Sequence, residues 1–178
     1  VSAQLVRHYP LKERFAHSVG YVGRINEKEL KDLDPTDYAG THHIGKTGIE
    51  RFYEDLTKLA WNIIETGFSS QVITPGKTRT SDVVWWMRQR VNDLGLGTWF
   101  QPSVSVQRQG KTEADVGEDP IIERGDVLHC DFGVTALRLN TDTQHMGYVL
   151  REGETDAPAG LKEALARSNR LQDIVFEE

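Results

Sequence analysis

The sequence predicts an α+β protein in which amphipathic helices and antiparallel strands occupy separate stretches of the chain. Apolar residues recur at helical spacing in residues 56–68 and 80–94, which predicts two helices that each bury one face. Polar and apolar residues alternate over 103–108, and residues 127–135 and 145–150 are rich in apolar and β-branched side chains, as strands are. The last two segments are expected to pair as an antiparallel hairpin.

The first 55 residues are predicted to hold two strands and two short helices, the strands over residues 4–8 and 17–25 and the helices over 26–33 and 49–55. Asn26 and Glu29 have the three-residue spacing of a capping box, so the first of these helices should begin there. It should end before Pro35, since the residue before a proline avoids helical backbone. The second is expected to continue into the helix at 56–68.

Beyond residue 80 the sequence also predicts which side chains each helix buries. The second long helix should be capped by Thr80 or Ser81, end at Gly95 and bury one face, formed by Val84, Met87, Val91 and Leu94. Trp85 and Trp86 are expected in a core or an interface. Residues 110–119 are polar and acidic, which predicts an exposed loop. A last helix over residues 156–178 should point four apolar side chains inward: Leu161, Leu165, Ile174 and Val175.

Composition excludes some classes of function. The chain has 178 residues, which is enough for one domain or two small ones, and a net charge of −6. That charge argues against nucleic-acid binding, which needs a clustered basic face. No apolar run approaches the roughly 20 residues needed to span a bilayer, and we expect neither a membrane segment nor a signal peptide. Cys130 is the one cysteine; it excludes an internal disulfide and is expected to be a buried, inert thiol.

One short motif has two alternative interpretations. Residues 40–47, GTHHIGKT, fit the phosphate-binding loop, in which Lys46 would contact phosphates and Thr47 a magnesium ion. The polar segment before the motif lacks the hydrophobic strand that such a loop follows. The Lys46–Gly48 run also resembles the Lys-Thr-Gly motif of penicilloyl transferases, but the sequence contains no Ser-x-x-Lys to supply the nucleophile. Nucleotide binding is therefore kept only as an alternative function.

Asp131 and Asp142 are the candidate metal ligands. If the strands around them pair as a hairpin, both carboxylates can face one pocket, where they need a cation or a shared proton to offset their repulsion. The alternative is that Asp131 begins a turn near Gly133 and that Asp142 is solvated in a polar loop. His129 can share a strand face with Asp131 but is interpreted as structural, and the role of His145 is left open between the same two alternatives.

The runs LVRHYPLKERFAHSVGYVGRINEKEL and DYAGTHHIGKTGIERFYED resemble the elongation-type class B penicillin-binding proteins (the penicillin-binding protein 2 family). The resemblance covers about residues 3–55. It implies part of the non-catalytic pedestal of those proteins, in which the GKTGIE run is a structural junction. The transpeptidase domain is not in this chain, so the resemblance implies a structural or interaction segment of a peptidoglycan-synthesis protein.

The runs VITPGKTRTSDVVWWMRQRV, TWFQPSVSVQRQG and RGDVLHCDFGVTALRLNTDTQHMGYVL resemble the pita-bread metallopeptidases, which include aminopeptidase P, prolidase and the creatinase relatives. This resemblance covers about residues 56–178. In that family two metal-binding aspartates stand eleven residues apart, which implies Asp131 and Asp142 as ligands, with Asp142 bridging. The family's further ligands, one histidine and two glutamates, have no counterpart in this sequence. Binding of Mn, Co or Zn is therefore expected to be weak or absent, and peptide hydrolysis is not expected from this chain alone.

Together the two resemblances predict a composite. Residues 1–55 would be a small α/β pedestal-like segment, and residues 56–178 a partial pita-bread fold of two helices, an antiparallel sheet and a C-terminal helix. The junction helix would run through Ile49 to Phe68. Surfaces that each parent fold covers should be buried here by mutual packing or by homo-oligomerisation. The first part points to the periplasm and the second to the cytoplasm.

Overall fold

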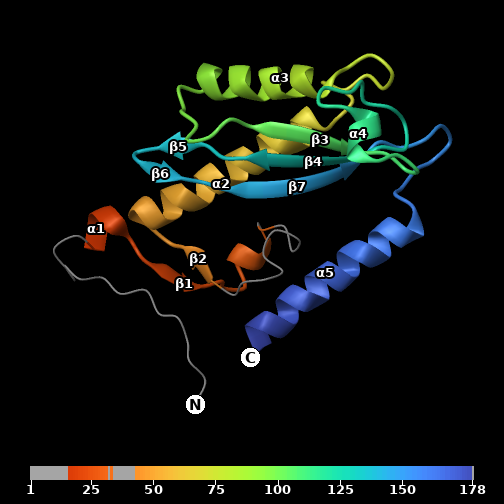
Figure 1. The fold of residues 1–178 in the computed structure, drawn as a ribbon. Helices are drawn as coiled ribbons and strands as arrows, with labels where there is room; N and C mark the ends of the chain where they lie inside the picture. Colours follow the sequence, from red (N-terminus) through yellow and green to blue (C-terminus); the bar gives the residue numbers. More distant parts are fainter. Residues whose placement is uncertain (1–15, 32, 34–42, 178) are drawn as a thin grey trace. The chain divides into compact units, whose positions relative to one another are not determined.

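The computed structural model of the chain describes residues 16–31, 33 and 43–177 (Figure 1). The strand predicted over residues 4–8 lies outside them. The chain divides into two compact units, Val1–Asp55 with Pro158–Glu178 and, separately, Leu56–Ala157. Helices and antiparallel strands occupy different stretches of the described chain, so the predicted α+β class is confirmed.

The first unit contains a small two-stranded sheet. It is formed by β1 (Val22–Arg24) and β2 (His43–Gly45), which pair antiparallel and follow a short helix, α1 (Ala16–Val19). The strand predicted over residues 17–25 is therefore wrong in its first half. Gly20 separates the two elements, with a φ of 77° that strands do not adopt. A Cβ at this position would lie 1.6 Å from the carbonyl oxygen of Thr47, so only glycine fits.

The predicted capping box at Asn26 is present, but the helix that it begins is short. Asn26 Oδ1 accepts a hydrogen bond from the backbone N–H of Glu29 at 3.0 Å, and Glu29 Oε2 accepts one from the backbone N–H of Asn26 at 2.8 Å. These reciprocal bonds satisfy two backbone donors that a helix start leaves unpaired. They start η2 (Glu29–Lys31), a single 3-10 turn, rather than a helix over residues 26–33.

α2 (Gly48–Gly67) is one continuous helix, as the helical spacing of residues 49–68 predicts. Its buried residues recur at intervals of three and four, so they form one stripe along the helix: Leu56, Ala60, Ile63, Ile64 and Gly67. A Cβ at Gly67 would lie 2.8 Å from Cε of Met87, so this glycine permits close packing. The division between the two units falls inside this helix, between Asp55 and Leu56.

The second unit is built on a three-stranded antiparallel sheet in the order β3-β4-β7. Its strands are β3 (Ser103–Gln107), β4 (Val127–Phe132) and β7 (Thr143–Tyr148). The register places Cys130 of β4 opposite Val104 on one side and His145 on the other. The predicted hairpin is thus present, with its second strand beginning two residues earlier than expected.

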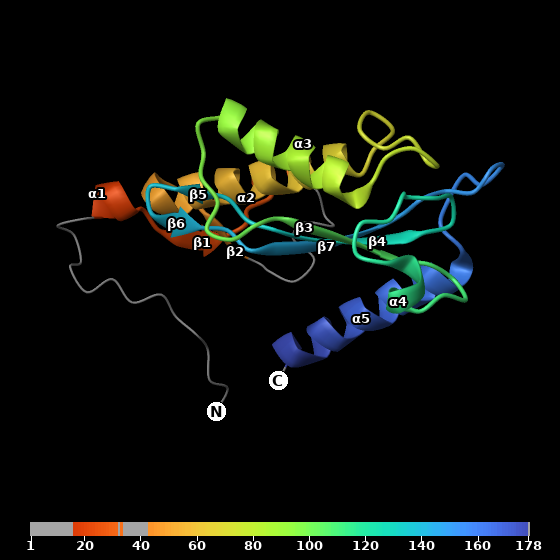
Figure 2. The same ribbon diagram turned by 45° about the horizontal axis from the view of Figure 1, so that its top comes forward.

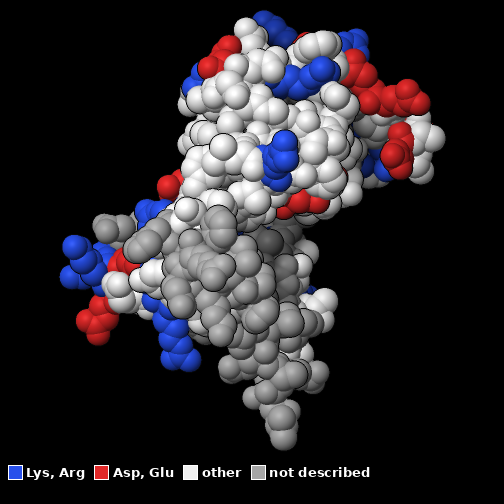
Figure 3. Space-filling model, turned by 90° about the vertical axis from the view of Figure 1, so that its left-hand side faces the viewer, with Lys and Arg blue, Asp and Glu red and all other residues white. Residues whose placement is uncertain are grey.

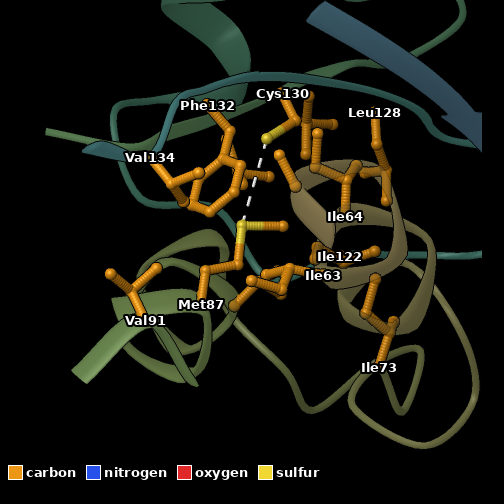
Figure 4. Close-up of a cluster of buried hydrophobic side chains, with 14 of the residues drawn as sticks. Ile63, Ile64, Ile73, Met87, Val91, Ile122, Leu128, Cys130, Phe132 and Val134 are labelled. Atoms are coloured by element: carbon orange, nitrogen blue, oxygen red, sulfur yellow. Dashed lines mark hydrogen bonds between the residues drawn. The ribbon is translucent and has the colours of Figure 1, made fainter. Parts of the chain in front are cut away.

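One face of this sheet packs against α2 and α3 (Thr80–Asp93), as Figures 2 and 4 show. The side chains of β4 alternate between intermediate and full burial, and Leu128, Cys130 and Phe132 enter the core. There they meet residues such as Ile64 of α2 and Met87 of α3 (Figure 4). Burial of each large apolar side chain contributes roughly 1.5–3 kcal/mol, so this core holds β4 with a fixed face inward.

The start of α3 is capped by carboxylates rather than by Thr80 or Ser81. The backbone N–H of Ser81 donates to Asp119 Oδ1 at 2.9 Å, and the backbone N–H of Arg79 donates to Asp82 Oδ2 at 2.8 Å. Both bonds place negative charge at a helix N-terminus, where it is stabilised. The helix ends at Asp93, and Gly95 follows with a φ of 67°, so the predicted stop is confirmed.

The two tryptophans of α3 have different environments. Trp86 packs against the core, whereas Trp85 is 64% exposed, with the guanidinium of Arg88 4.7 Å from its ring centre. The predicted core face is also shifted, because Leu94 is 42% exposed and Val83 is fully buried in its place. Neighbouring residues in a helix are 100° apart, so a pair of adjacent tryptophans cannot share one narrow core face.

A turn of two residues closes the hairpin beyond β4 and β7. β5 (Thr135–Ala136) pairs with β6 (Leu139–Asn140), and the intervening Leu137 and Arg138 have φ values of 52° and 65°. Positive φ at both central residues is the geometry of a type I′ turn. Such turns favour Asn-Gly, so the Leu-Arg pair carries no sequence signal for a turn of this type.

For the two remaining helices, α4 and α5, the sequence predicted only some of the features that the structure shows. α4 (Glu113–Val116) is a single exposed turn inside the predicted loop over residues 110–119. α5 (Ala159–Glu177) begins after Pro158, as predicted. Three of the four side chains predicted to point inward are not buried: Leu161, Leu165 and Ile174 are 38%, 63% and 41% exposed. The side chain of the fourth, Val175, lies outside the described part of the chain. The helical period identifies which side chains share a face, but not whether another element covers that face.

Candidate functional site

The open face of the β3–β4–β7 sheet carries the candidate metal ligand Asp131. Side chains alternate along a strand, so the inward positions of Leu128, Cys130 and Phe132 leave His129 and Asp131 on the opposite face. The register aligns Asp131 with Ser103 on β3 and with Gln144 on β7. This face is therefore polar around Asp131, in contrast to the apolar face that packs on the helices.

Asp142 lies close to Asp131 on the same hairpin. β4 and β7 keep one register through Phe132 opposite Thr143, and the backbone N–H of Thr141 donates to the carbonyl of Val134 at 2.9 Å. The same register aligns Asp142 with Gly133, two residues from the Asp131–Gln144 pair. The two aspartates are thus diagonal neighbours, with Cα atoms about 7–8 Å apart.

The two carboxylates have different surroundings. Oδ1 of Asp131 is buried without a hydrogen-bond partner among the described residues, whereas Asp142 is exposed. A buried carboxylate oxygen without a donor is unfavourable, so a cation beside Asp131 would supply the interaction that this oxygen lacks.

Gly133 and Trp99 hold the hairpin at this point. A Cβ at Gly133 would lie 2.1 Å from the carbonyl oxygen of Thr141 and 3.0 Å from Nε1 of Trp99. Trp99 Nε1 donates to that same carbonyl at 2.9 Å. Because a side chain cannot fit, the backbone of the Asp-Phe-Gly run approaches its neighbours closely and fixes where Asp131 and Asp142 lie.

The histidines near the site have structural contacts. His129 Nε2 lies 3.1 Å from Gln144 Oε1, and the His145 ring packs edge-on against Trp61 at a centroid distance of 5.7 Å. His145 faces the core side of the sheet, away from Asp131. Within the described part of the chain, no group of three or more His, Cys, Asp and Glu side chains is placed to hold a metal ion.

Cys130 is a buried free thiol, as the sequence predicts. Its Sγ donates a weak hydrogen bond to Sδ of Met87 at 4.0 Å (Figure 4). Burial, with a smaller contribution from the charge of Asp131, raises the pKa of the Cys130 thiol to about 12. Because the thiolate is the nucleophile, Cys130 is not a reactive group at neutral pH.

The Lys46 motif has no phosphate-loop geometry in its described part. His43–Gly45 form β2, an antiparallel strand, where a phosphate loop should stand. Lys46 Nζ forms an ion pair with Glu29 Oε2, and this bond lowers the pKa of Glu29. The motif instead joins a sheet to the start of α2, and residues 40–42 lie outside the described part of the chain.

An ion pair between the partly buried Arg108 and the buried Asp126 of the second unit was not predicted. Arg108 donates through Nε and Nη2 to the two carboxylate oxygens of Asp126, at 2.8 and 2.9 Å, and Asp126 is 1% exposed. The sequence offered no signal beyond an arginine at the end of one strand and an aspartate before the next.

On the face shown in Figure 3, Lys and Arg are interspersed with Asp and Glu over the described residues.

Comparison with known proteins gives a class for the first part of the chain. Residues 1–59 match the family model described as the penicillin-binding protein dimerisation domain. The peptidoglycan D,D-transpeptidase MrdA of Acinetobacter baumannii is 57% identical over 134 residues, covering 72% of this chain and 18% of the relative. MrdA of Haemophilus influenzae is 52% identical over 54 residues, covering 28% of this chain and 8% of the relative.

These matches confirm the predicted resemblance of residues 3–55 to the penicillin-binding proteins. The chain spans less than a fifth of the length of either relative. The Acinetobacter alignment covers 72% of the chain, which is more than residues 1–59, so it continues into the second part. No described helix is both long and apolar enough to cross a membrane.

Two solved structures are similar to parts of the chain. PBP2 of Pseudomonas aeruginosa is 83% identical over 30% of this chain and 12% of its own, with a TM-score of 0.28. An X-Pro aminopeptidase of Thermotoga maritima covers 80% of this chain and 42% of its own, at 18% identity and a TM-score of 0.38. The latter belongs to the group of peptidases that residues 56–178 resemble.

Proposed function

We propose that this chain is a non-catalytic interaction segment of a peptidoglycan-synthesis protein of the periplasm. The observation that carries the proposal is the match of residues 1–59 to a dimerisation domain of penicillin-binding proteins, together with the high identity to MrdA transpeptidases. A dimerisation domain acts by presenting a surface to another protein, not by transferring an acyl group. The ion pair of Lys46 with Glu29 agrees with a structural role for the Lys-Thr-Gly run.

The test combines an interaction assay with an activity assay. The purified chain is mixed with the periplasmic part of a MrdA transpeptidase, and complex formation is followed by sedimentation velocity. We expect a complex between the two proteins and no covalent labelling of the chain by a fluorescent penicillin. Acylation of the chain would show a catalytic protein, and absence of a complex at the highest soluble concentrations would refute an interaction segment.

Gly20 and Gly160, both in the first unit, provide contrasting variants for this assay. Gly20→Val places a side chain where a Cβ would already lie 1.6 Å from the Thr47 carbonyl oxygen, whereas a Cβ at Gly160 meets nothing within 4 Å. We therefore expect Gly20→Val to abolish the complex by distorting the first unit and Gly160→Ala to leave it intact. Circular dichroism of both variants reports whether the second unit remains folded.

Weak binding of a divalent cation by Asp131 and Asp142 is a second candidate function, and it fits a composite chain with a metallopeptidase-like second part. Its support is the buried Asp131 Oδ1 that has no hydrogen-bond partner among the described residues, with Asp142 beside it. Two carboxylates suit a hard cation whose other positions are filled by water. A catalytic metal site needs about three protein ligands in fixed geometry, and the described residues supply two. We therefore propose binding without peptide hydrolysis.

Calorimetric titration of the metal-free chain with Mn²⁺, and separately with Co²⁺ and Zn²⁺, tests this candidate. We expect weak binding that is lost in Asp131→Asn and reduced in Asp142→Asn. The matched control is Asp115→Asn, a substitution of an exposed aspartate in the second unit that only caps α4. Equal binding by all three variants would mean that the cation does not occupy the Asp131 site. Hydrolysis of an Xaa-Pro peptide would contradict the non-catalytic assignment.

A further inference from the structure

β7 is an edge strand without the features that usually prevent edges from pairing. The sheet order is β3-β4-β7, so β7 is hydrogen-bonded on one side, to β4, and to no other strand in the described chain. Its six residues, TQHMGY, contain no lysine, no other charged side chain at neutral pH and no proline. Proteins protect exposed edges with such residues or with bulges, because an open edge is a template for another strand.

The hydrogen-bond pattern shows which residues of β7 point their backbone groups outward. The backbone N–H of Val149 donates to the carbonyl of Asp126, and alternate residues of an antiparallel strand bond to the same neighbour. The residues between, Gln144, Met146 and Tyr148, direct their N–H and C=O groups away from β4. Their side chains lie on the open face of the sheet, and Met146 is 64% exposed.

The geometry points to β7 as a homodimer interface, in which two copies of this chain pair β7 with β7 antiparallel around a two-fold axis at Met146. This inference goes beyond the proposed interaction segment, since it assigns a surface in the second unit. Centred on Met146, the pairing aligns Gln144 of each copy with Tyr148 of the other. All three outward residues then form hydrogen-bonded pairs, and the two sheets become one sheet of six strands.

The side chains at the ends of this register are complementary. Gln144 Oε1 is 3.1 Å from His129 Nε2, which leaves the Gln144 amide N–H groups to donate elsewhere. The Tyr148 hydroxyl donates to Glu154 Oε2 at 3.0 Å, which leaves its oxygen able to accept. Gln144 can therefore donate to Tyr148 of the second copy at both ends. At the axis, two exposed methionines meet and remove apolar surface from water.

A second copy is favoured over a partner of another kind because the strand is neutral and self-complementary. Pairing β7 with itself brings no like charges together, and a two-fold contact closes after two copies. Pairing β7 with the other edge strand, β3, would instead leave a free edge on each copy and propagate. Pro102 directly precedes β3 and Arg108 directly follows it, which protects that edge.

Sedimentation equilibrium of the full chain with two lysine variants tests the interface. Met146→Lys places like charges opposite each other at the axis, and such a pair is destabilising. We expect it to raise the dimer dissociation constant at least about tenfold, which corresponds to about 1.4 kcal/mol. Ser105→Lys adds the same charge to the same face on β3 and should leave the dissociation constant unchanged. A chain that is monomeric throughout, or a dimer indifferent to Met146→Lys, would overturn the inference.

Disulfide trapping tests the register independently of stability. In the proposed dimer, the two Met146 Cα atoms form a hydrogen-bonded pair about 5.5 Å apart, within the 4.4–6.8 Å range of disulfides. Met146→Cys should therefore form a covalent dimer on mild oxidation. Gln144→Cys should not, because the two positions are offset by four residues, about 14 Å. Equal cross-linking of both variants would refute this register. Cross-linking of neither variant would refute it as well, and it is the result expected if the chain dimerises through residues 1–59 alone.

Discussion

Removing Arg108 should destabilise the second unit strongly, because its partner Asp126 is buried. Arg108 binds both carboxylate oxygens of Asp126, which is 1% exposed, and the hydrogen bond to Asp126 raises the pKa of Arg108. In Arg108→Ala the carboxylate loses this ligand and keeps the backbone N–H of Glu123, at 2.7 Å. Loss of one partner from a buried ion pair costs about 3–5 kcal/mol, against about 0–1 kcal/mol for an exposed pair.

The remaining bond from Glu123 and the 24% exposure of the Arg108 side chain both place the expected loss of unfolding free energy at or below the lower end, about 3 kcal/mol. Urea unfolding followed by tryptophan fluorescence measures it, since all four tryptophans lie within residues 61–99 of the second unit. Arg124→Ala is the matched control, because Arg124 donates to a single carbonyl, that of Leu150, from an exposed position. It should cost less than about 1.5 kcal/mol.

Two outcomes would refute this reasoning. The first is an Arg108→Ala variant no less stable than Arg124→Ala, which would show that Asp126 is not buried as a charge. The second concerns the double variant Arg108→Met, Asp126→Leu. Replacing a buried ion pair by apolar residues is often neutral, so the double variant should recover most of the lost stability. A double variant less stable than Arg108→Ala would show that Asp126 acts mainly through its bond to Glu123.

Three further predictions concern the same unit. Cys130 should react with a thiol reagent at pH 8 only when the protein unfolds, since its pKa is raised to about 12; rapid reaction of the native chain would show an exposed thiolate. Leu137→Asn with Arg138→Gly should raise the free energy of unfolding by about 1 kcal/mol or more, because both residues have positive φ. Asp119→Asn should cost about 1 kcal/mol at pH 7 by weakening the cap of α3. Hydrogen bonds from Ser81 lower the pKa of Asp119, so the stabilisation is present above the ordinary carboxyl pKa of about 3.9 and disappears as pH falls through the lowered value. The difference between Asp119→Asn and the parent chain should therefore vanish in acid.

The elements that the sequence predicts well are those in which local pattern and packing agree. α2 buries residues at intervals of three and four, and β3 and β4 alternate as their sequences do. The errors occur where a contact between residues distant in sequence determines where an element begins or which face it buries. The close approach of Gly20 to the Thr47 carbonyl delays the start of β1. Asp119 caps α3 from a position 38 residues away from Ser81. The apolar face of α5 remains exposed, because no described element covers it. None of these contacts has a signature in the local sequence.

The same distinction applies to the candidate site. The sequence places Asp131 and Asp142 on one hairpin, because a spacing of eleven residues is compatible with two paired strands and a turn between them. It does not reveal that one oxygen of Asp131 is buried without a partner, since that depends on how the strands approach around Gly133. Nor does it reveal the bond between His129 and Gln144, which follows from the register of β4 and β7.

What fixes the two aspartates is the apolar face of the hairpin rather than any interaction between the carboxylates. Leu128, Cys130 and Phe132 are all buried against α2 and α3, and a shift of register by one residue would exchange the two faces of β7 relative to β4. The core therefore keeps Asp131 on the open face whether or not a cation binds there. The spacing of Asp131 and Asp142 is thus evidence about the fold, and a metal titration of Asp131→Asn is the measurement that bears on function.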